Sequence, residues 1–180
     1  MRFIFFVIAM IQILLGNLDW EIGKLKRNEF LKTSGTIDTN VYFVEEGSVR
    51  IFIEDEDEER IIRFGYQGNI IVSLDSFLSG KPSEFYIQAI KASTVKVASK
   101  NDFYEFINSS NENLKLWNSI LEDLVLQQIE REKDLLYSSP KVRYERVLKR
   151  SPKLFQKIPN KYIANYLRMS PETLSRLKKS

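Results

Sequence analysis

Apolar and polar residues alternate over short runs between Trp20 and Ser99, and turn-forming residues separate the runs. Alternation with a period of two is typical of strands that bury one face. We expect strands at Glu21–Leu25, Val41–Val44, Ser48–Glu54, Glu59–Phe64, Asn69–Ser73, Phe85–Ile90 and Thr94–Ala98. Many short strands in succession indicate an all-β sandwich or barrel.

Helical spacing replaces this alternation after Ser99. A short helix is expected at Lys100–Ile107 and a long one at Asn111–Tyr137. The main apolar stripe of the long helix consists of Leu114, Trp117, Ile120, Leu121, Leu124 and Val125. Leu116 and Leu126 lie outside the stripe and add apolar surface, as a helix needs when it contacts both a sheet and a partner.

The C-terminal residues have the pattern of a helix-turn-helix. A first helix is expected after Asn160, a predicted N-cap, and its inward positions are Ile163, Ala164 and Leu167. Arg168-Met169 makes the turn. Ser170 is the N-cap of the second helix, Pro171 occupies its first position, and Leu174 and Leu177 face inward.

The outer face of the second helix carries candidate DNA-contacting groups: Ser170, Pro171, Glu172, Ser175, Arg176, Lys178 and Lys179. In the major groove a carboxylate accepts from the cytosine amino group and an arginine pairs with guanine, while lysines and the helix N-terminus hold phosphates. A helical hairpin whose polar face is merely solvated has the same pattern and is the alternative interpretation.

The 180 residues include neither cysteine nor histidine. This composition excludes disulfides, cysteine–histidine zinc sites, cysteine-bound iron–sulfur clusters, histidine-ligated haem and histidine-dependent catalysis. The sequence also has no phosphate-cradling glycine loop and no convincing pair of catalytic carboxylates. We therefore expect neither a cofactor nor enzymatic activity.

Charge is distributed unevenly, although the net charge is only +3. Residues 138–180 contain twelve Lys/Arg and two Asp/Glu, a net charge of +10, and residues 1–137 contain fifteen and twenty-two, a net charge of −7. A basic C-terminal module favours binding to duplex DNA, because lysine and arginine neutralise phosphates and release counterions.

Residues 1–15 are almost continuously apolar. They resemble the core of a signal peptide but lack a small-residue cleavage site, and they are short for a membrane span. We favour a segment packed on the sheet or the dimer, or a stretch translated from a misassigned start, over a membrane anchor. A DNA-binding protein is expected in the cytoplasm and away from the membrane.

Three segments resemble the CRP/FNR family of bacterial transcription regulators. Ser170–Arg176 is similar to its recognition-helix motif Glu-x-x-Ser-Arg, Ile163–Leu167 to the preceding helix, and Tyr42–Ile53 to its strand–turn–strand around a glycine. The resemblance runs from about Phe30 to the C-terminus, roughly five-sixths of the chain.

The resemblance implies an α+β fold. It predicts a double-stranded β-helix (jelly roll) like that of cyclic-nucleotide-binding domains, then a long dimerisation helix and a helix-turn-helix. The expected divisions are an atypical apolar segment at 1–19, the β-roll at 20–110, the dimerisation helix at 111–137 and the DNA-binding domain at 138–180. The family's two-stranded wing is missing from the sequence, so a wingless module is expected.

The resemblance also locates the family's phosphate-binding segment between Gly68 and Ala89. Here Asn69 follows the glycine in place of the family's glutamate, and Ser83 and Glu84 occupy the Arg-Ser positions. Loss of the arginine removes the strongest phosphate contact, so control by cyclic AMP is not expected. Asn69, Ser83, Glu84 and Tyr86 remain candidates for another effector pocket, although the aromatic residues there are more commonly core.

The expected function is therefore that of a sequence-specific DNA-binding transcription regulator acting as a homodimer. The family's motif goes with TTGA half-sites, so an inverted repeat of that element is the expected target, and RNA polymerase is an expected partner. The effector is unknown. The alternative function is a small-ligand sensor whose C-terminal helices bind a protein partner.

Overall fold

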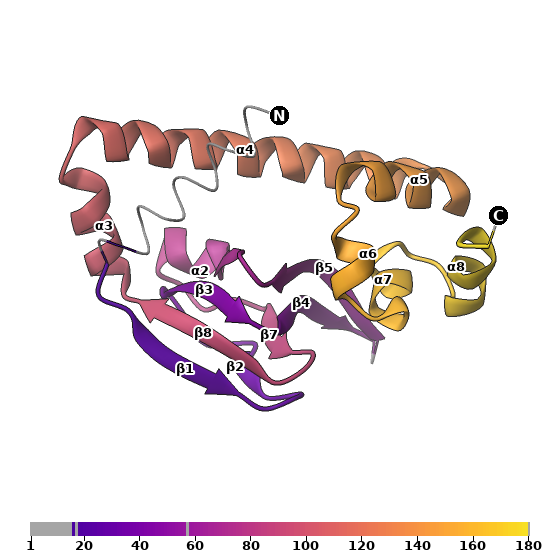
Figure 1. Cartoon of the computed structure of the whole chain (residues 1–180), viewed down its shortest axis with the longest axis horizontal. Helices are drawn as coiled ribbons and strands as arrows, with labels where there is room; N and C mark the ends of the chain where they lie inside the picture. Colours follow the sequence, from indigo (N-terminus) through magenta and orange to yellow (C-terminus); the bar gives the residue numbers. More distant parts are fainter. Residues whose placement is uncertain (1–15, 17, 57, 180) are drawn as a thin grey trace.

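Two antiparallel four-stranded sheets form a β-roll in the computed structural model, which describes residues 16, 18–56 and 58–179 (Figure 1). One sheet has the strand order β1-β8-β3-β6 and the other β2-β7-β4-β5. The strands are β1 (Glu21–Leu25), β2 (Phe30–Lys32), β3 (Val41–Glu46), β4 (Ser48–Asp55), β5 (Glu58–Tyr66), β6 (Ile70–Val72), β7 (Tyr86–Ala89) and β8 (Ser93–Ala98).

The apolar positions of the alternating strands meet between the two sheets. Val44, Val49, Ile87 and Val95 are completely buried there. The tight turn between β3 and β4 requires Gly47, whose φ is 98°. A Cβ at this position would lie 2.1 Å from the Ser93 hydroxyl oxygen, so only glycine fits.

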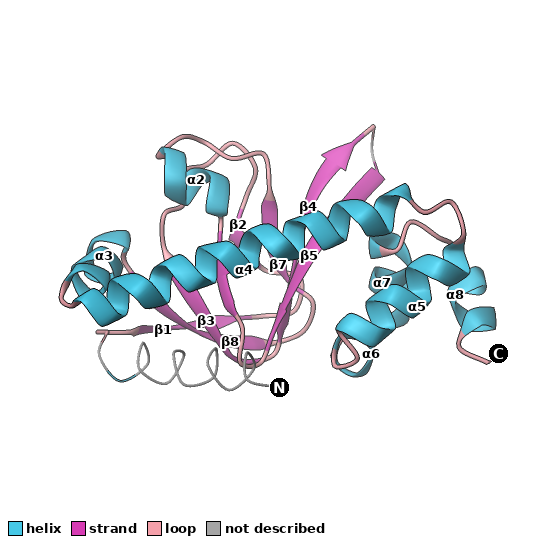
Figure 2. Ribbon diagram, turned by 90° about the horizontal axis from the view of Figure 1, so that it is seen from above, coloured by secondary structure: helices cyan, strands magenta, loops and turns pink. Residues whose placement is uncertain are grey.

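The helices that follow the β-roll cover one side of it and extend beyond it to the C-terminal module. Helix α2 (Leu74–Ser79) lies within the β-roll sequence, and α3 (Lys100–Asn108) and α4 (Asn111–Leu136) follow it. Figure 2 shows α4 lying across the β-roll, from α3 at one end to the C-terminal helices at the other. Aromatic rings join these helices: Phe77 lies 5.9 Å from Phe103 and 6.4 Å from Trp117, centroid to centroid.

The C-terminal module consists of α5 (Pro140–Arg150), α6 (Leu154–Lys157), α7 (Asn160–Tyr166) and α8 (Pro171–Leu177). Among the described residues, none of the helices combines the length and the apolar character needed to cross a bilayer. The predicted packing of residues 1–15 lies outside the described residues.

The predicted fold class is confirmed, and four details of the sequence prediction are corrected. Strand β2 and helix α2 were not expected, because each is too short to show a period. Leu116 is buried against the β-roll rather than available to a partner, because α4 turns this side towards the aromatic cluster. Asn160 is the first helical residue of α7, and Pro159 is its N-cap.

Candidate DNA-binding interface

Helices α7 and α8 form a compact pair around a shared apolar contact. Ile163, Ala164, Leu167 and Leu174 are completely buried, and they join one cluster with residues of α5 and α6. The turn between the helices passes through Arg168, whose φ of 54° is left-handed. Buried leucines lie on both sides of this turn, Leu167 before it and Leu174 after it, and they pack α8 against α7.

Ser170 begins α8 as the sequence predicts. Its hydroxyl oxygen accepts a hydrogen bond from the Thr173 backbone N–H at 3.2 Å, and Pro171 occupies the first turn. The Glu172 side chain accepts hydrogen bonds from its own backbone N–H and from Ser170, and these bonds lower the pKa of its carboxyl group, with Arg176 adding a further attraction. Glu172 is therefore an ionised acceptor near neutral pH.

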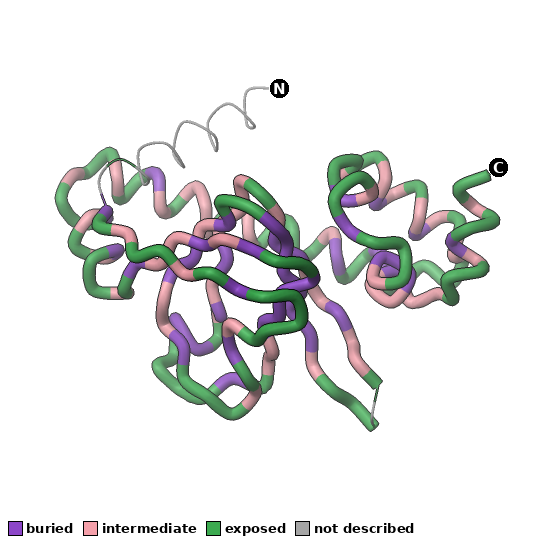
Figure 3. The backbone as a smooth tube through the Cα atoms, turned by 60° about the horizontal axis from the view of Figure 1, so that its bottom comes forward, coloured by how far each residue is buried: buried purple, intermediate pink, exposed green. Residues whose placement is uncertain are grey.

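The outer side of α8 is open to solvent. Glu172, Ser175 and Arg176 are exposed, and most of α8 is exposed or intermediate in Figure 3. Arg176 is held only loosely, by a 3.4 Å contact from Nη2 to the Thr173 hydroxyl. Residues at positions i, i+3 and i+4 share one helix face, so these three side chains can contact the same ligand.

The two terminal lysines differ in their contacts. Lys178 donates a hydrogen bond from Nζ to Asn160 Oδ1 at 2.9 Å, which joins the end of α8 to the start of α7. Lys179 is exposed. Lys178 therefore helps to hold the helix pair together.

Arg143 of α5 positions the turn of the helix pair. Its guanidinium donates to the carbonyls of Leu167 at 2.8 Å and Arg168 at 2.9 Å, and to those of Tyr137 and Ser138 in the connection after α4. One buried side chain thus connects α4, α5 and the turn. The sequence does not reveal this role, because the backbone carbonyls that Arg143 contacts are present at every position and carry no side-chain signal.

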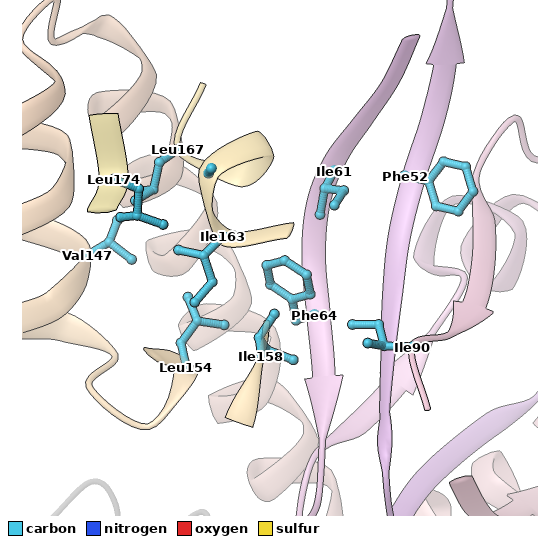
Figure 4. Packing of buried hydrophobic residues seen from close by; sticks show 11 residues of the cluster. Phe52, Ile61, Phe64, Ile90, Val147, Leu154, Ile158, Ile163, Leu167 and Leu174 are labelled. Atoms are coloured by element: carbon cyan, nitrogen blue, oxygen red, sulfur yellow. The ribbon is translucent and has the colours of Figure 1, made fainter. Parts of the chain in front are cut away.

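The β-roll contacts the C-terminal module directly. Ile61 and Phe64 lie on the side of β5 that faces the module, and they share its apolar cluster (Figure 4). Asn165 of α7 accepts a hydrogen bond from the Ile61 backbone N–H at 2.9 Å and donates one to the Glu59 carbonyl at 2.7 Å. The amide therefore pairs with β5 as a neighbouring strand would, and it holds the module at the sheet edge.

Arg50 of β4 strengthens this contact from the outer face of the sheet, the face that also carries Phe52. It is buried and paired with Glu59 and Gln88, and its guanidinium carbon lies 4.8 Å from the centroid of the Tyr162 ring on α7. A desolvated arginine over an aromatic face is a favourable contact. The orientation of α7 therefore depends on residues of β4 and β5.

The predicted effector residues do not converge. Among the described residues, no hydrogen bond joins any two of Asn69, Ser83, Glu84 and Tyr86. Asn69 accepts from the Tyr66 backbone N–H, and Ser83 is buried in a bridge to Thr36. Glu84 is exposed, and the Tyr86 ring stacks on Phe52 at 5.0 Å while its hydroxyl donates to Glu54.

A cation from another strand, Lys32 of β2, contacts this segment. Lys32 is buried, and its Nζ donates to the carbonyls of Thr33, Ser83 and Phe85. Burial lowers the pKa of Lys32, while Asp75 and Asp38 oppose this effect. Lys32 also borders a groove of about 400 Å³ that includes Phe30, Thr36, Asn40 and Tyr42. The Lys32 ammonium therefore binds the backbone carbonyls of the loop at 83–85.

In the part of the chain that the structure describes, no three acidic side chains come close enough together to hold a metal ion. The acidic tip between β4 and β5 is exposed, and Arg60 pairs there with Glu58 at 2.7 Å.

The arrangement of a β-roll, a long helix and a helix-turn-helix is the fold of CRP/FNR-family regulators. The structure is similar to FixK2 from Bradyrhizobium japonicum, with 18% identity, a TM-score of 0.72, and coverage of 90% of this chain and 84% of that one. It is also similar to a CooA variant from Carboxydothermus hydrogenoformans, with 18% identity, a TM-score of 0.69, and coverage of 89% of this chain and 75% of that one. A third similar structure is a transcriptional regulator of the CRP family from Thermus thermophilus. Its identity is 16%, its TM-score is 0.62, and the match covers 87% of this chain and 82% of that one.

Residues 22–110 match the family model of the cyclic nucleotide-binding domain. A comparison with curated protein sequences finds no match. The resemblance seen in the sequence is therefore confirmed for the fold, and the domain model matches the part of the chain that holds the β-roll.

Proposed function

We propose that this chain is a sequence-specific DNA-binding transcription regulator of the CRP/FNR type. The observation that carries the proposal is the face of α8, on which Glu172, Ser175 and Arg176 are exposed together above a fully buried leucine core. The fold supports it, because it is similar to that of FixK2 over 90% of this chain and to that of a CRP-family regulator over 87%. In this proposal the chain is a cytoplasmic regulator rather than an enzyme, and RNA polymerase is its partner in transcription.

Each group on α8 has a distinct role in the proposed complex. The ionised Glu172 accepts from a cytosine amino group, and Arg176 pairs bidentately with the O6 and N7 of guanine. Ser175 contacts a phosphate or a base edge, and Lys178 and Lys179 lie near the phosphates. Ser170 and Pro171 open the helix towards a phosphate, where the backbone N–H groups and the helix dipole favour an anion.

A homodimer provides the second half-site. Helix α4 exposes Val125, Leu126 and Ile129 on its solvent side, with 59%, 60% and 41% of their surfaces accessible, and Leu114 and Leu136 extend this apolar surface along the helix. A long helix with an uncovered apolar side fits packing against its twin. Two α8 helices would then contact an inverted repeat, for which TTGA half-sites are the candidate.

Control by cyclic AMP does not fit the segment between Gly68 and Ala89. An exposed carboxylate, Glu84, follows the buried Ser83, and Lys32 donates to backbone carbonyls rather than facing a ligand. A cyclic phosphate would meet an acidic side chain and no free arginine in this segment. We therefore propose that the regulator acts independently of this nucleotide.

Selection from a randomised duplex pool at two salt concentrations, with and without cyclic AMP, tests the proposal. We expect a symmetric site containing TTGA that is the same with the nucleotide. Arg176→Ala should weaken binding by about 1–3 kcal/mol per half-site and relax the preference at one guanine. Lys153→Ala is the matched control, because Lys153 is an exposed cation away from α8, and it should change affinity alike on all sequences.

Two results would count against the proposal. Equal losses on every sequence for Arg176→Ala would remove its role in base recognition. Weak, steeply salt-dependent and sequence-independent binding of the unmodified chain would favour a sensor whose C-terminal helices bind a protein partner.

A further inference from the structure

Arginine side chains gather around Tyr166, at the junction of the β-roll, α4 and the C-terminal module. Arg131 of α4 lies over the Tyr166 ring, with its guanidinium carbon 3.7 Å from the ring centroid, and its Nη2 donates to the Tyr166 carbonyl at 2.6 Å. Arg63 of β5 and Arg150 of α5 lie close enough to the Tyr166 hydroxyl to interact with it electrostatically. Arg168 follows in the turn of the helix pair.

Two of these guanidinium groups have a buried N–H without an acceptor. Among the described residues, Nη1 of Arg131 and Nη1 of Arg168 are buried and make no hydrogen bond. Only 8% of the Arg131 surface is accessible. Burial lowers the pKa of both side chains, and the positive charge of Arg168 lowers the pKa of Arg131 further. A buried charged donor without a partner is costly, so this position favours an acceptor.

The acidic side chains nearby already form ion pairs with other basic residues. Asp134 is completely buried, and its carboxylate accepts from Arg146 at 2.8 Å and from Arg150. Glu130 accepts from Arg146 and Lys133. In the described part of the chain, no carboxylate forms an ion pair with Arg131 or Arg168. The junction therefore carries more positive charge than its own acids balance.

We propose that this junction binds a small anion, whose phosphate or carboxylate group lies between Arg131 and Arg168. Planar guanidinium forks match both oxyanions, and the water-poor setting strengthens each charged hydrogen bond. Arg131 belongs to the long helix and Arg168 to the turn that precedes α8, so the anion connects the two. A ligand that binds this arrangement stabilises it over any in which the module has moved away from α4.

The site is separate from the exposed face of α8, so its test does not depend on DNA binding. The full chain is titrated with inorganic phosphate, and separately with acetate, at constant ionic strength, while calorimetry follows binding and a thermal melt follows stability. We expect saturable binding of one anion per chain and a higher melting temperature. A response to phosphate alone, or to both anions, identifies the preferred head group.

Arg168→Gln removes one arm of the site and should weaken anion binding by about 10- to 100-fold, the equivalent of one or two charge-assisted hydrogen bonds. Arg131→Gln gives an independent second variant, and circular dichroism shows whether each variant folds. Lys161→Gln is the matched control, because it removes an exposed cation of the same module. It should bind the anion as the unmodified chain does.

Three outcomes would overturn the inference. The unmodified chain could fail to bind either anion, which would mean that water alone satisfies the two N–H groups. All variants could respond equally, which would indicate adventitious binding at the surface. Arg168→Gln could instead change only the dimer dissociation constant, and the acceptor would then be an acid of a second copy.

Discussion

The α7–α8 pair and the segment from Gly68 to Ala89 position their candidate groups in different ways. On α8, Glu172 and Arg176 share a face because helical spacing places them there, and Ser170 caps the same helix. In the other segment, Ser83 and Tyr86 lie in separate environments, one in a bridge to Thr36 and the other on Phe52. Local periodicity fixes the first arrangement, whereas contacts across the β-roll fix the second.

This contrast suggests where each region is sensitive to change. Substitutions on the outer face of the helix pair should change the free energy of unfolding little, but they should change DNA recognition. The effector segment should respond mainly through the backbone contacts that hold its loop, such as those of Lys32.

The largest expected effect is on the core of the helix pair. Leu174→Ala removes a completely buried side chain and should lower the free energy of unfolding by about 2–5 kcal/mol, because it leaves a cavity between α8 and α5. Urea denaturation measures this change. Leu78→Ala is the matched control in α2, where 56% of the leucine is accessible, and it should change stability by less than about 0.5 kcal/mol. Equal effects of the two variants would contradict the packing described for α8.

The next effect concerns the contact between α7 and β5. Asn165→Ala leaves the Ile61 N–H and the Glu59 carbonyl without their partner, which should cost about 1–3 kcal/mol. Hydrogen exchange at Ile61 should become faster, because this amide would lose its protection. Asn160→Ala is the control in the same helix, since the exposed Asn160 side chain forms a hydrogen bond with Lys178 and, among the described residues, none with β5. Unchanged exchange at Ile61 in the Asn165 variant would show that the module is held by its apolar contacts alone.

Much of the fold was predictable from the sequence, because alternation and helical spacing are local signals. Most strands of the β-roll, the long helix and Ser170 as a cap were expected, and the structure contains them. The residues that place the module were not predicted. Asn165 meets Ile61 across 104 positions of sequence, and Arg143 contacts backbone carbonyls 24 and 25 positions away. No spacing rule connects such pairs, since the packing of α7 on the sheet edge brings the first together and the packing of α5 on the α7–α8 turn the second.

The same limit explains Lys32, whose importance is visible only in the folded chain. Three residues of apolar and basic character, Phe30–Lys32, show no period, so neither β2 nor the burial of its lysine was expected. Once β2 pairs with β7, the ammonium meets the carbonyls of Ser83 and Phe85. The loop at the candidate effector position is therefore held by a contact from another strand.

The smallest expected effect is a pH dependence that tests this buried ammonium. Because burial lowers the pKa of Lys32 below its ordinary 10.5, the unfolded chain binds more protons than the folded one between the lowered pKa and 10.5. Stability should therefore rise with pH in this window. Lys32→Met should lack this rise, and urea denaturation at a series of pH values below 10 measures the difference in slope.

The tyrosines limit the upper end of that window. Burial raises the pKa of Tyr42 and Tyr66 above 10.0, so above that pH the folded chain retains protons that the unfolded chain has lost, and stability falls. Lys32→Met leaves both tyrosines in place, so subtracting its profile isolates the lysine. If the two profiles are parallel below pH 10, Lys32 keeps its ordinary pKa when folded. The attraction of Asp75 and Asp38 would then balance the effect of burial on the Lys32 ammonium, which lies buried against the loop at 83–85.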